Sequence, residues 1–153
     1  MMKFLDLKIP PPVVVVLTGL LMWLTPSGAL EVLGGSWSLY LGIVLMLLGV
    51  LMDGYAAMMF IVAKTTISPI APQNASTLIV SGIFKLTRNP MYLGMAVLLL
   101  GWALLLQSAA ALMGPILFIT YITRFQILPE ERILTQKWGD TYTTYLSKTK
   151  RWL

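Results

Sequence analysis

Residues 91–128 read MYLGMAVLLLGWALLLQSAAALMGPILFITYITRFQIL, and this stretch decides the fold. It holds two apolar runs that only Gln107 and Ser108 separate. Each run approaches the roughly 20 residues that cross the hydrocarbon core of a bilayer. Because two residues leave room only for a tight turn, we expect residues 91–106 and 109–128 to form an antiparallel hairpin of membrane-spanning helices.

Two further apolar runs, residues 10–24 and 37–63, precede the hairpin. The 153-residue chain is 58% hydrophobic and 11% charged, whereas a soluble domain carries about 25% charged residues. We therefore predict an all-α membrane protein with about four transmembrane helices in one integral-membrane domain, residues 1–153. Its expected parts are two N-terminal spans that shape the lipid-facing region (1–63), a cytoplasmic loop (64–89), the helical hairpin (90–128) and a cytoplasmic tail (129–153).

The basic residues of the chain fall on one side of this arrangement. The connections at residues 25–36 and 107–108 hold none of the 11 Lys and Arg residues. By the positive-inside bias, both termini are expected in the cytoplasm. The net charge of +5 then faces anionic lipid headgroups, so no nucleic-acid partner is needed. The chain has no Cys and no His, which excludes disulfides and the usual zinc ligands, and we expect no metal site.

Small residues recur every seven positions along residues 37–63 and just before them: Gly35, Gly42, Gly49, Ala56 and Ala63. This spacing puts them on one helix face, where a neighbouring helix can approach closely. We favour packing within the bundle over a dimer seam. Asp53 is the one acid in this run, and an acid at that depth should face protein or water. A role toward substrate and a plain buried contact both remain open for Asp53.

The tail also shows a helical pattern. Within residues 129–146, Leu134, Trp138, Tyr142 and Tyr145 follow one another at intervals of four, four and three residues. This spacing predicts one amphipathic helix. Such a helix would lie on the membrane surface or fold against the cytoplasmic loop.

Two polar clusters flank the hairpin. The first begins with Arg88 and continues into Asn89 and Pro90, which suit the N-cap and first position of a helix. Such a helix start can bind a carboxylate, and Gly94 would let a ligand approach. The second cluster, Glu130 and Glu131, would meet an ammonium on the same membrane face. An ordinary capped helix with acids in its first turn is the alternative reading.

Both clusters lie in segments with a family resemblance. Residues 78–94 (LIVSGIFKLTRNPMYLG) form one half, and residues 128–134 (LPEERIL), 138–145 (WGDTYTTY) and 151–153 (RWL) form the other. Together they resemble the integral-membrane methyltransferases of the isoprenylcysteine carboxyl methyltransferase and phospholipid N-methyltransferase group. The resemblance covers about half of the chain. Many of these relatives have His where this chain has Asn89, so a role that needs a titrating imidazole is absent here.

The resemblance implies S-adenosylmethionine as cofactor, S-adenosylhomocysteine as product, and a cofactor site between the hairpin and the tail. The residues implied to line or close that site are Asn89, Pro90, Tyr92, Gly94, Glu130, Glu131, Tyr142 and Tyr145. The acceptor is expected to be a lipid or a prenylated small molecule that enters from the bilayer.

The chemistry of methyl transfer divides the remaining candidates by acceptor. A carboxylate acceptor, like that of isoprenylcysteine, needs only a cation to place it, and Arg88, Arg124 or Arg151 can supply one. An amine, as in a phospholipid headgroup, must first lose a proton, and Glu131 or Asp53 can accept it. We favour the carboxylate, because basic residues outnumber acidic residues near the predicted site. Outside this class, a small four-span transporter using Asp53 and a structural membrane subunit without a ligand are the alternatives.

Overall fold

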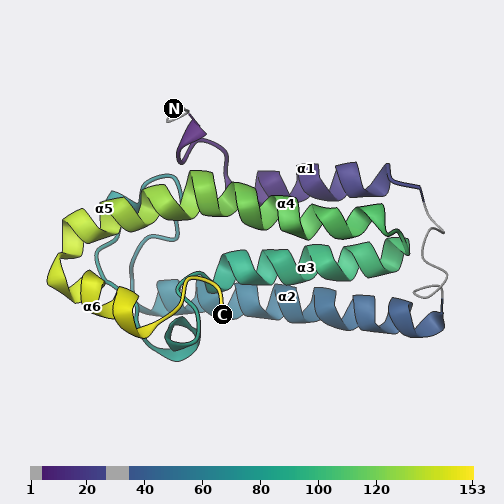
Figure 1. Ribbon diagram of the computed structural model, residues 1–153. Helices are drawn as coiled ribbons and strands as arrows, with labels where there is room; N and C mark the ends of the chain where they lie inside the picture. The colour runs from purple at the N-terminus through teal and green to yellow at the C-terminus, as the bar shows by residue number, and fades with distance from the viewer. Residues whose placement is uncertain (1–4, 27–34) are drawn as a thin grey trace.

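The computed structural model of the chain describes residues 5–26 and 35–153 (Figure 1). Every regular element in these residues is helical, which confirms the all-α prediction. Lys3 and part of the first interhelical connection lie outside the described residues. The longer helices are α1 (Pro11–Trp23), α2 (Ser36–Val62), α3 (Pro90–Leu106), α4 (Met113–Ile122), α5 (Leu128–Trp138) and α6 (Asp140–Lys148). Three short 3₁₀ helices cover Pro72–Asn74, Gly82–Lys85 and Ala110–Leu112, and a π-helix covers Thr123–Ile127.

Two helical stretches in the described residues are long and apolar enough to cross a membrane: α2 and the continuous run Ala110–Trp138. The helices α1 and α3 are apolar but shorter. Only 11% of the most apolar window of α2 is buried within the protein. A soluble monomer rarely exposes so large an apolar surface, so α2 is suited to a lipid environment.

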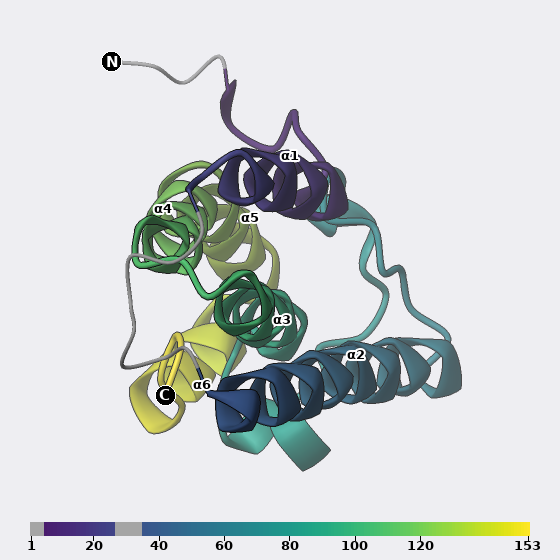
Figure 2. The ribbon, with the colours of Figure 1, turned by 90° about the vertical axis from the view of Figure 1, so that its right-hand side faces the viewer.

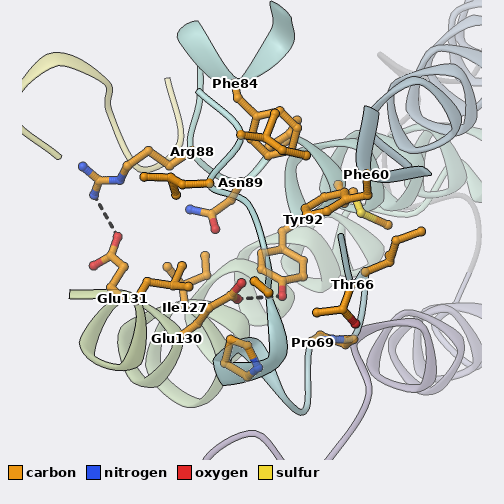
Figure 3. Close-up of a pocket in the computed structure, with 18 of the residues that line it drawn as sticks. Phe60, Thr66, Pro69, Phe84, Arg88, Asn89, Tyr92, Ile127, Glu130 and Glu131 are labelled. Atoms are coloured by element: carbon orange, nitrogen blue, oxygen red, sulfur yellow. Dashed lines mark hydrogen bonds and ion pairs between the residues drawn. The ribbon is translucent and has the colours of Figure 1, made fainter. Parts of the chain in front are cut away.

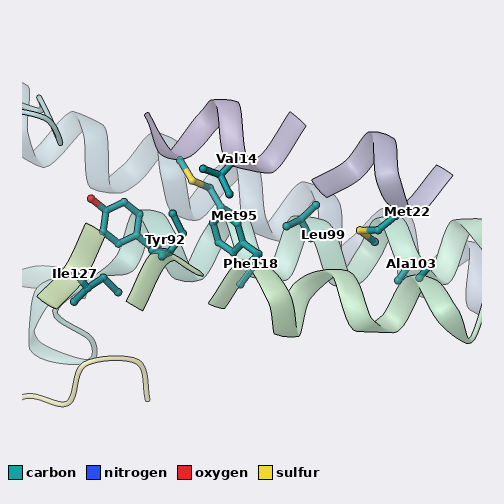
Figure 4. Packing of buried hydrophobic residues seen from close by; sticks show 11 residues of the cluster. Val14, Met22, Tyr92, Met95, Leu99, Ala103, Phe118 and Ile127 are labelled. Atoms are coloured by element: carbon teal, nitrogen blue, oxygen red, sulfur yellow. The ribbon is translucent and has the colours of Figure 1, made fainter. Parts of the chain in front are cut away.

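Helix α3 occupies the centre of the bundle, with α1 and α4 on one side and α2 on the other (Figure 2). The core lies between α1, α3 and α4, where Met22, Leu99, Phe118 and Ile122 are almost fully buried (Figure 4). Its residues recur at helical spacing along α3, which therefore buries more of its surface than α2 does. The central position of α3 fixes the residues at its N-terminal end, Arg88 to Tyr92.

The antiparallel helices α2 and α3 approach closely through paired glycines. Gly42 lies against Gly101, and Gly49 lies against Gly94. A Cβ atom added at Gly49 would lie 2.5 Å from the Gly94 carbonyl oxygen, and one at Gly101 would lie 2.5 Å from the Gly42 carbonyl oxygen. No larger residue fits at these positions without moving a backbone. The seven-residue pattern therefore serves packing within the bundle, as the sequence predicted.

The predicted hairpin turn is present at Gln107 and Ser108. Gln107 adopts the left-handed conformation that ends α3, with φ of 50°. Its side chain donates to the Ser38 hydroxyl at 3.2 Å, and the Ser108 and Thr25 hydroxyls lie 2.9 Å apart. The end of α1, the start of α2 and the hairpin turn thus meet at one end of the bundle, which carries no Lys or Arg at residues 25–36 or 107–108.

The predicted break between span four and the tail, at Leu128, is wrong. The helix continues from Ala110 to Trp138 through the π-helix. Pro129 has no backbone N–H to donate to the Phe125 carbonyl one turn earlier. That carbonyl accepts a hydrogen bond from the backbone N–H of Leu7 instead, at 2.9 Å. The proline therefore widens one turn without ending the helix, and it leaves Glu130 and Glu131 on a rigid helix.

The prediction of a single tail helix over residues 129–146 is also wrong. Gly139 separates α5 from α6, with φ of 52° and ψ of −127°. Glycine adopts this conformation far more readily than any residue with a Cβ atom. The break turns α6 back toward the start of α3 (Figure 1), so Tyr142 and Tyr145 still face the same cavity as Leu134 and Trp138.

We expect Gly139→Ala to destabilise the fold by about 1–3 kcal/mol, because alanine is strained at this φ and ψ. The nearby space is open, since no atom lies within 4 Å of a Cβ atom built there. Thermal unfolding in detergent measures the effect, with the exposed Thr141→Ala as control. An unchanged midpoint for Gly139→Ala would mean that the turn does not require glycine.

Candidate functional site

A cavity of about 220 Å³ lies at the basic end of the bundle (Figure 3). Its walls come from the starts of α1 and α3, the end of α2, the segment 66–89, and the helices α5 and α6. The predicted site residues that line it are Arg88, Asn89, Pro90, Tyr92, Glu130, Glu131, Tyr142 and Tyr145. The two sequence clusters, 36 or more residues apart in the chain, therefore face one space.

Arg88 joins the start of α3 to the C-terminal segment. Its guanidinium donates to the Leu146 and Thr149 carbonyl oxygens at 2.9 and 2.8 Å, and to Glu131 Oε1 at 2.8 Å. Its backbone N–H donates to the Lys150 carbonyl oxygen at 3.0 Å. The side chain is 10% exposed, and its Nε is buried without a hydrogen-bond partner among the described residues. Arg88 is thus held in place while its Nε donor remains unused.

Glu131 is bound by two arginines. Besides Arg88, it accepts hydrogen bonds from Arg151 Nε at 3.0 Å and from an Arg151 terminal nitrogen at 2.7 Å. These hydrogen bonds raise the pKa of Arg151, which keeps its guanidinium charged. The three side chains carry a net charge of +1, and through them Glu131 anchors the C-terminal segment.

The sequence prediction that the Asn89 side chain caps α3 is wrong. The side chain donates to the Arg151 carbonyl oxygen at 2.9 Å and makes no capping bond. The hydroxyl of the buried Thr87 accepts a hydrogen bond from the Asn89 backbone N–H at 3.2 Å. The same hydroxyl donates to the Arg151 carbonyl oxygen at 3.1 Å. Asn89 and Thr87 therefore bind the C-terminal segment across the site.

Glu130 is held differently from Glu131. The Tyr92 hydroxyl donates to Glu130 Oε2 at 3.0 Å (Figure 3). Within residues 5–26 and 35–153, no Lys or Arg forms an ion pair with Glu130. Glu130 is therefore the carboxyl of the pair that can meet a cationic group in the cavity.

Tyr142 and Tyr145 cover the cavity from α6, and both are buried. Tyr145 donates to the Phe84 carbonyl oxygen at 2.6 Å. Burial raises the pKa of Tyr145 to about 12. Burial, followed by the negative charge of Glu131, raises the pKa of Tyr142 as well. Both phenols stay protonated near neutral pH, so they act as hydrogen-bond donors and not as bases.

Four predicted residues lie away from the cavity walls: Asp53, Gly94, Arg124 and Arg151, the last of which reaches the site only through Glu131. Gly94 does not open space for a ligand, because the Asp53 carboxyl and the Gly49 backbone of α2 fill the space beside it. Asp53 thus packs against α3, and its Oδ1 is buried without a hydrogen-bond partner in the described structure. Arg124 lies 3.6 Å from Asp6 and over the Phe125 ring, away from the cavity.

Sequence reasoning missed several residues of the site. Thr87 shows no pattern that marks it, because its role depends on the distant residue Arg151. Phe60 and Phe84 pack edge to face, with ring centroids 5.5 Å apart, and both line the cavity. Phe84 lies within residues 78–94, which carry the family resemblance, but no pattern in that segment marks Phe84 itself.

Comparison with known proteins gives the chain a family. Residues 37–141, more than half of the chain, match the sequence model of the phospholipid methyltransferase family. An uncharacterized protein of Haemophilus influenzae is 46% identical over 63 residues, which cover 41% of this chain and 100% of that protein. No solved structure matches the chain. The chain belongs to the phospholipid methyltransferase family of integral membrane proteins, and it is an S-adenosylmethionine-dependent methyltransferase.

Proposed function

We propose that the protein transfers a methyl group to the amine headgroup of a membrane lipid, at the cytoplasmic end of a four-helix membrane bundle. The observation that carries this proposal is the cavity that brings Glu130, Arg88 and the α6 tyrosines together. Family membership favours methyl transfer over the Asp53-dependent transporter and over a structural subunit. Asp53 also lies outside the cavity walls.

The proposed topology has α1, α2, α3 and α4 crossing the membrane with both termini in the cytoplasm. The connections at the opposite end of the bundle carry no Lys or Arg, which supports this orientation. Helix α1 has 13 residues, or about 20 Å at 1.5 Å per residue. This length is short of the roughly 30 Å hydrocarbon core, so the bilayer is expected to thin beside α1 or to meet its flanking residues.

The residues of the cavity fit the amino-acid end of S-adenosylmethionine, which is a zwitterion. When bound, the cofactor supplies a methyl group activated on a sulfonium sulfur. Glu130 would hold its ammonium, because no described cation competes for that carboxyl. The unused Nε of Arg88 and the +1 charge of its cluster suit the carboxylate. Tyr142 and Tyr145 would exclude water from the reacting groups.

The choice of an amine over a carboxylate acceptor rests on where the arginines are. The sequence favoured a carboxylate because basic residues outnumber acidic ones near the predicted site, with Arg88, Arg124 and Arg151 as the candidates to place it. In the structure Arg88 and Arg151 are paired with Glu131, and Arg124 lies beside Asp6. The headgroup amine, which attacks as the free base after releasing its proton to water, is the ordinary nucleophile that a phospholipid offers, and this agrees with the family description. An isoprenylcysteine-like carboxylate is the second candidate.

Calorimetric titration of S-adenosylhomocysteine into the detergent-purified protein tests the cofactor site. We expect saturable binding that weakens about tenfold or more in Glu130→Gln, because a charge-assisted bond contributes about 1.5–3 kcal/mol. Tyr92→Phe keeps the carboxylate and should weaken binding less. If the folded wild-type protein binds no S-adenosylhomocysteine in detergent or in nanodiscs, the proposed function is wrong.

Transfer of a labelled methyl group then identifies the acceptor. One set of vesicles contains phosphatidylethanolamine, and a matched set contains phosphatidylcholine with a prenylated cysteine. Label in the phosphatidylethanolamine fraction supports the amine, whereas label that base treatment releases from the prenylated cysteine supports a carboxyl ester.

A further inference from the structure

A second hollow lies next to the cavity, on the apolar surface between α1 and α2. It has a volume of about 360 Å³, and its walls include Val16, Gly19 and Leu20 of α1, Met46 of α2, and Leu98 and Trp102 of α3. The helices α1 and α2 lie on different sides of α3 (Figure 2), and residues of α3 form the floor of the hollow. We call this hollow the α1–α2 groove.

The groove continues the wall of the cavity along two helices. On α1, Pro12 lines the cavity, and Val16, one turn further on, lines the groove. On α3, Met95 lines the cavity, and Leu98, less than one turn further on, lines the groove. The cavity supplies the charged and hydrogen-bonding groups, whereas the described walls of the groove are apolar except for the indole N–H of its tryptophans.

The size of the two spaces indicates what fills the groove. The cavity of about 220 Å³ holds the charged and hydrogen-bonding side chains, whereas the groove of about 360 Å³ is lined by apolar side chains, so the groove is the space that suits a hydrocarbon chain. Along α1 the groove runs from Val15 to Trp23, which is about 12 Å at 1.5 Å per residue. This length is less than half of the roughly 30 Å hydrocarbon core, so the groove can hold part of one lipid chain.

A cross-connection between α1 and α3 lies along the groove. The Trp102 indole N–H donates to the Gly19 carbonyl oxygen of α1 at 3.2 Å. This bond ties α1 to α3 and holds the ring in the groove wall, and Leu20 and Trp23 of α1 line the groove beyond it. Gly19 lacks a side chain where the groove passes it, and the nearest atoms to a Cβ atom built there, on Leu99 and Trp102, are 4.0 Å away.

We infer that the α1–α2 groove binds one hydrocarbon chain of the acceptor lipid, whose headgroup enters the cavity. This inference rests on the proposed function. It identifies the acceptor as a lipid with at least one linear hydrocarbon chain.

Photoaffinity labelling tests this inference without any need for turnover. The probe is palmitoyl lysophosphatidylethanolamine with a diazirine in the outer half of its chain, added to phosphatidylcholine nanodiscs that contain the protein. Mass spectrometry measures labelling of the peptides that hold residues 15–23 and 98–102. We expect labelling there that saturates and that unlabelled palmitoyl lysophosphatidylethanolamine competes away. Labelling of the lipid-facing side of α2 should not saturate.

Gly19→Leu fills the groove and should lower the saturable labelling by about tenfold or more, which is what excluding two methylenes from an apolar site costs. Gly54→Leu is the matched control, because nothing lies within 4 Å of a Cβ atom built at Gly54. Leu20→Trp, at a half-exposed groove position, serves as a second blocking variant if Gly19→Leu does not fold.

The inference is overturned if labelling of the groove does not saturate, or if the blocking variants label as the wild type does. Binding of S-adenosylhomocysteine is measured on the same samples. If the protein binds S-adenosylhomocysteine but the blocking variants label as the wild type does, only the role of the groove is refuted. If the wild type does not bind S-adenosylhomocysteine, the proposed function is refuted.

Discussion

Replacing Arg88 with alanine is expected to abolish methyl transfer and to release the C-terminal segment from the site. The change leaves the Leu146 and Thr149 carbonyl oxygens without their donor, and Glu131 with Arg151 alone. The Arg88 and Glu131 side chains are only 10% and 13% exposed, and breaking a buried pair costs about 3–5 kcal/mol. We therefore expect activity and S-adenosylhomocysteine affinity to fall at least about 100-fold.

Hydrogen exchange of residues 140–153 and calorimetric titration of S-adenosylhomocysteine measure the two effects of Arg88→Ala. Arg88→Lys should not restore either property, since one ammonium cannot reach the three acceptors that the planar guanidinium reaches. Arg132→Ala is the control: Arg132 pairs with Asp6 at 2.9 Å but is 55% exposed, so its loss should change stability by less than about 1 kcal/mol. If residues 140–153 of Arg88→Ala remained protected from hydrogen exchange and the variant bound S-adenosylhomocysteine as tightly as the wild type, this role of Arg88 would be contradicted.

Much of the fold was predictable because it depends on local patterns. The apolar runs predicted the helices, and the two polar residues between them predicted the hairpin turn. The spacing of Gly42 and Gly49 also predicted a close helix contact, although it did not identify Gly94 and Gly101 as the partners. The continuation of the helix past Leu128 was missed, because a proline can sit inside a widened helix turn when another segment binds the freed carbonyl. The helix break at Gly139 was missed, because the apolar spacing of the tail continues across it.

The site was only partly predictable, because its chemistry depends on pairings between distant segments. The sequence placed Glu130 and Glu131 beside each other but not in different roles. Their roles differ because Tyr92 reaches one of them and two arginines reach the other. Gly94 shows the opposite failure: its missing side chain suggested access for a ligand, whereas it makes room for α2. The absence of a side chain at Gly94 does not by itself show whether a ligand or a neighbouring helix will occupy the space beside it.

Gly49→Val is expected to prevent stable packing of α2 on α3, with loss of the folded protein or of most of its stability. A Cβ atom at Gly49 would lie 2.5 Å from the Gly94 carbonyl oxygen, 2.9 Å from the Leu98 nitrogen and 3.0 Å from the Leu98 Cβ. These atoms belong to a central helix that cannot yield, so the helices must separate. Overpacking typically costs about 1–3 kcal/mol and more where backbone must move.

The direction of the stability change on replacing glycine with alanine distinguishes close packing of α2 on α3 from ordinary helix propensity. Alanine in place of glycine should stabilise an exposed helix position by about 1 kcal/mol, and Gly54→Ala, five residues further along α2 with open space around it, should do so. Gly49→Ala should destabilise the same helix, and Gly49→Val should do so more strongly. Unfolding midpoints in a titration with sodium dodecyl sulfate measure all three. If Gly49→Ala stabilised the protein as Gly54→Ala does, α2 would not lie against α3 at this distance, and the position of Arg88 at the cavity would need another support.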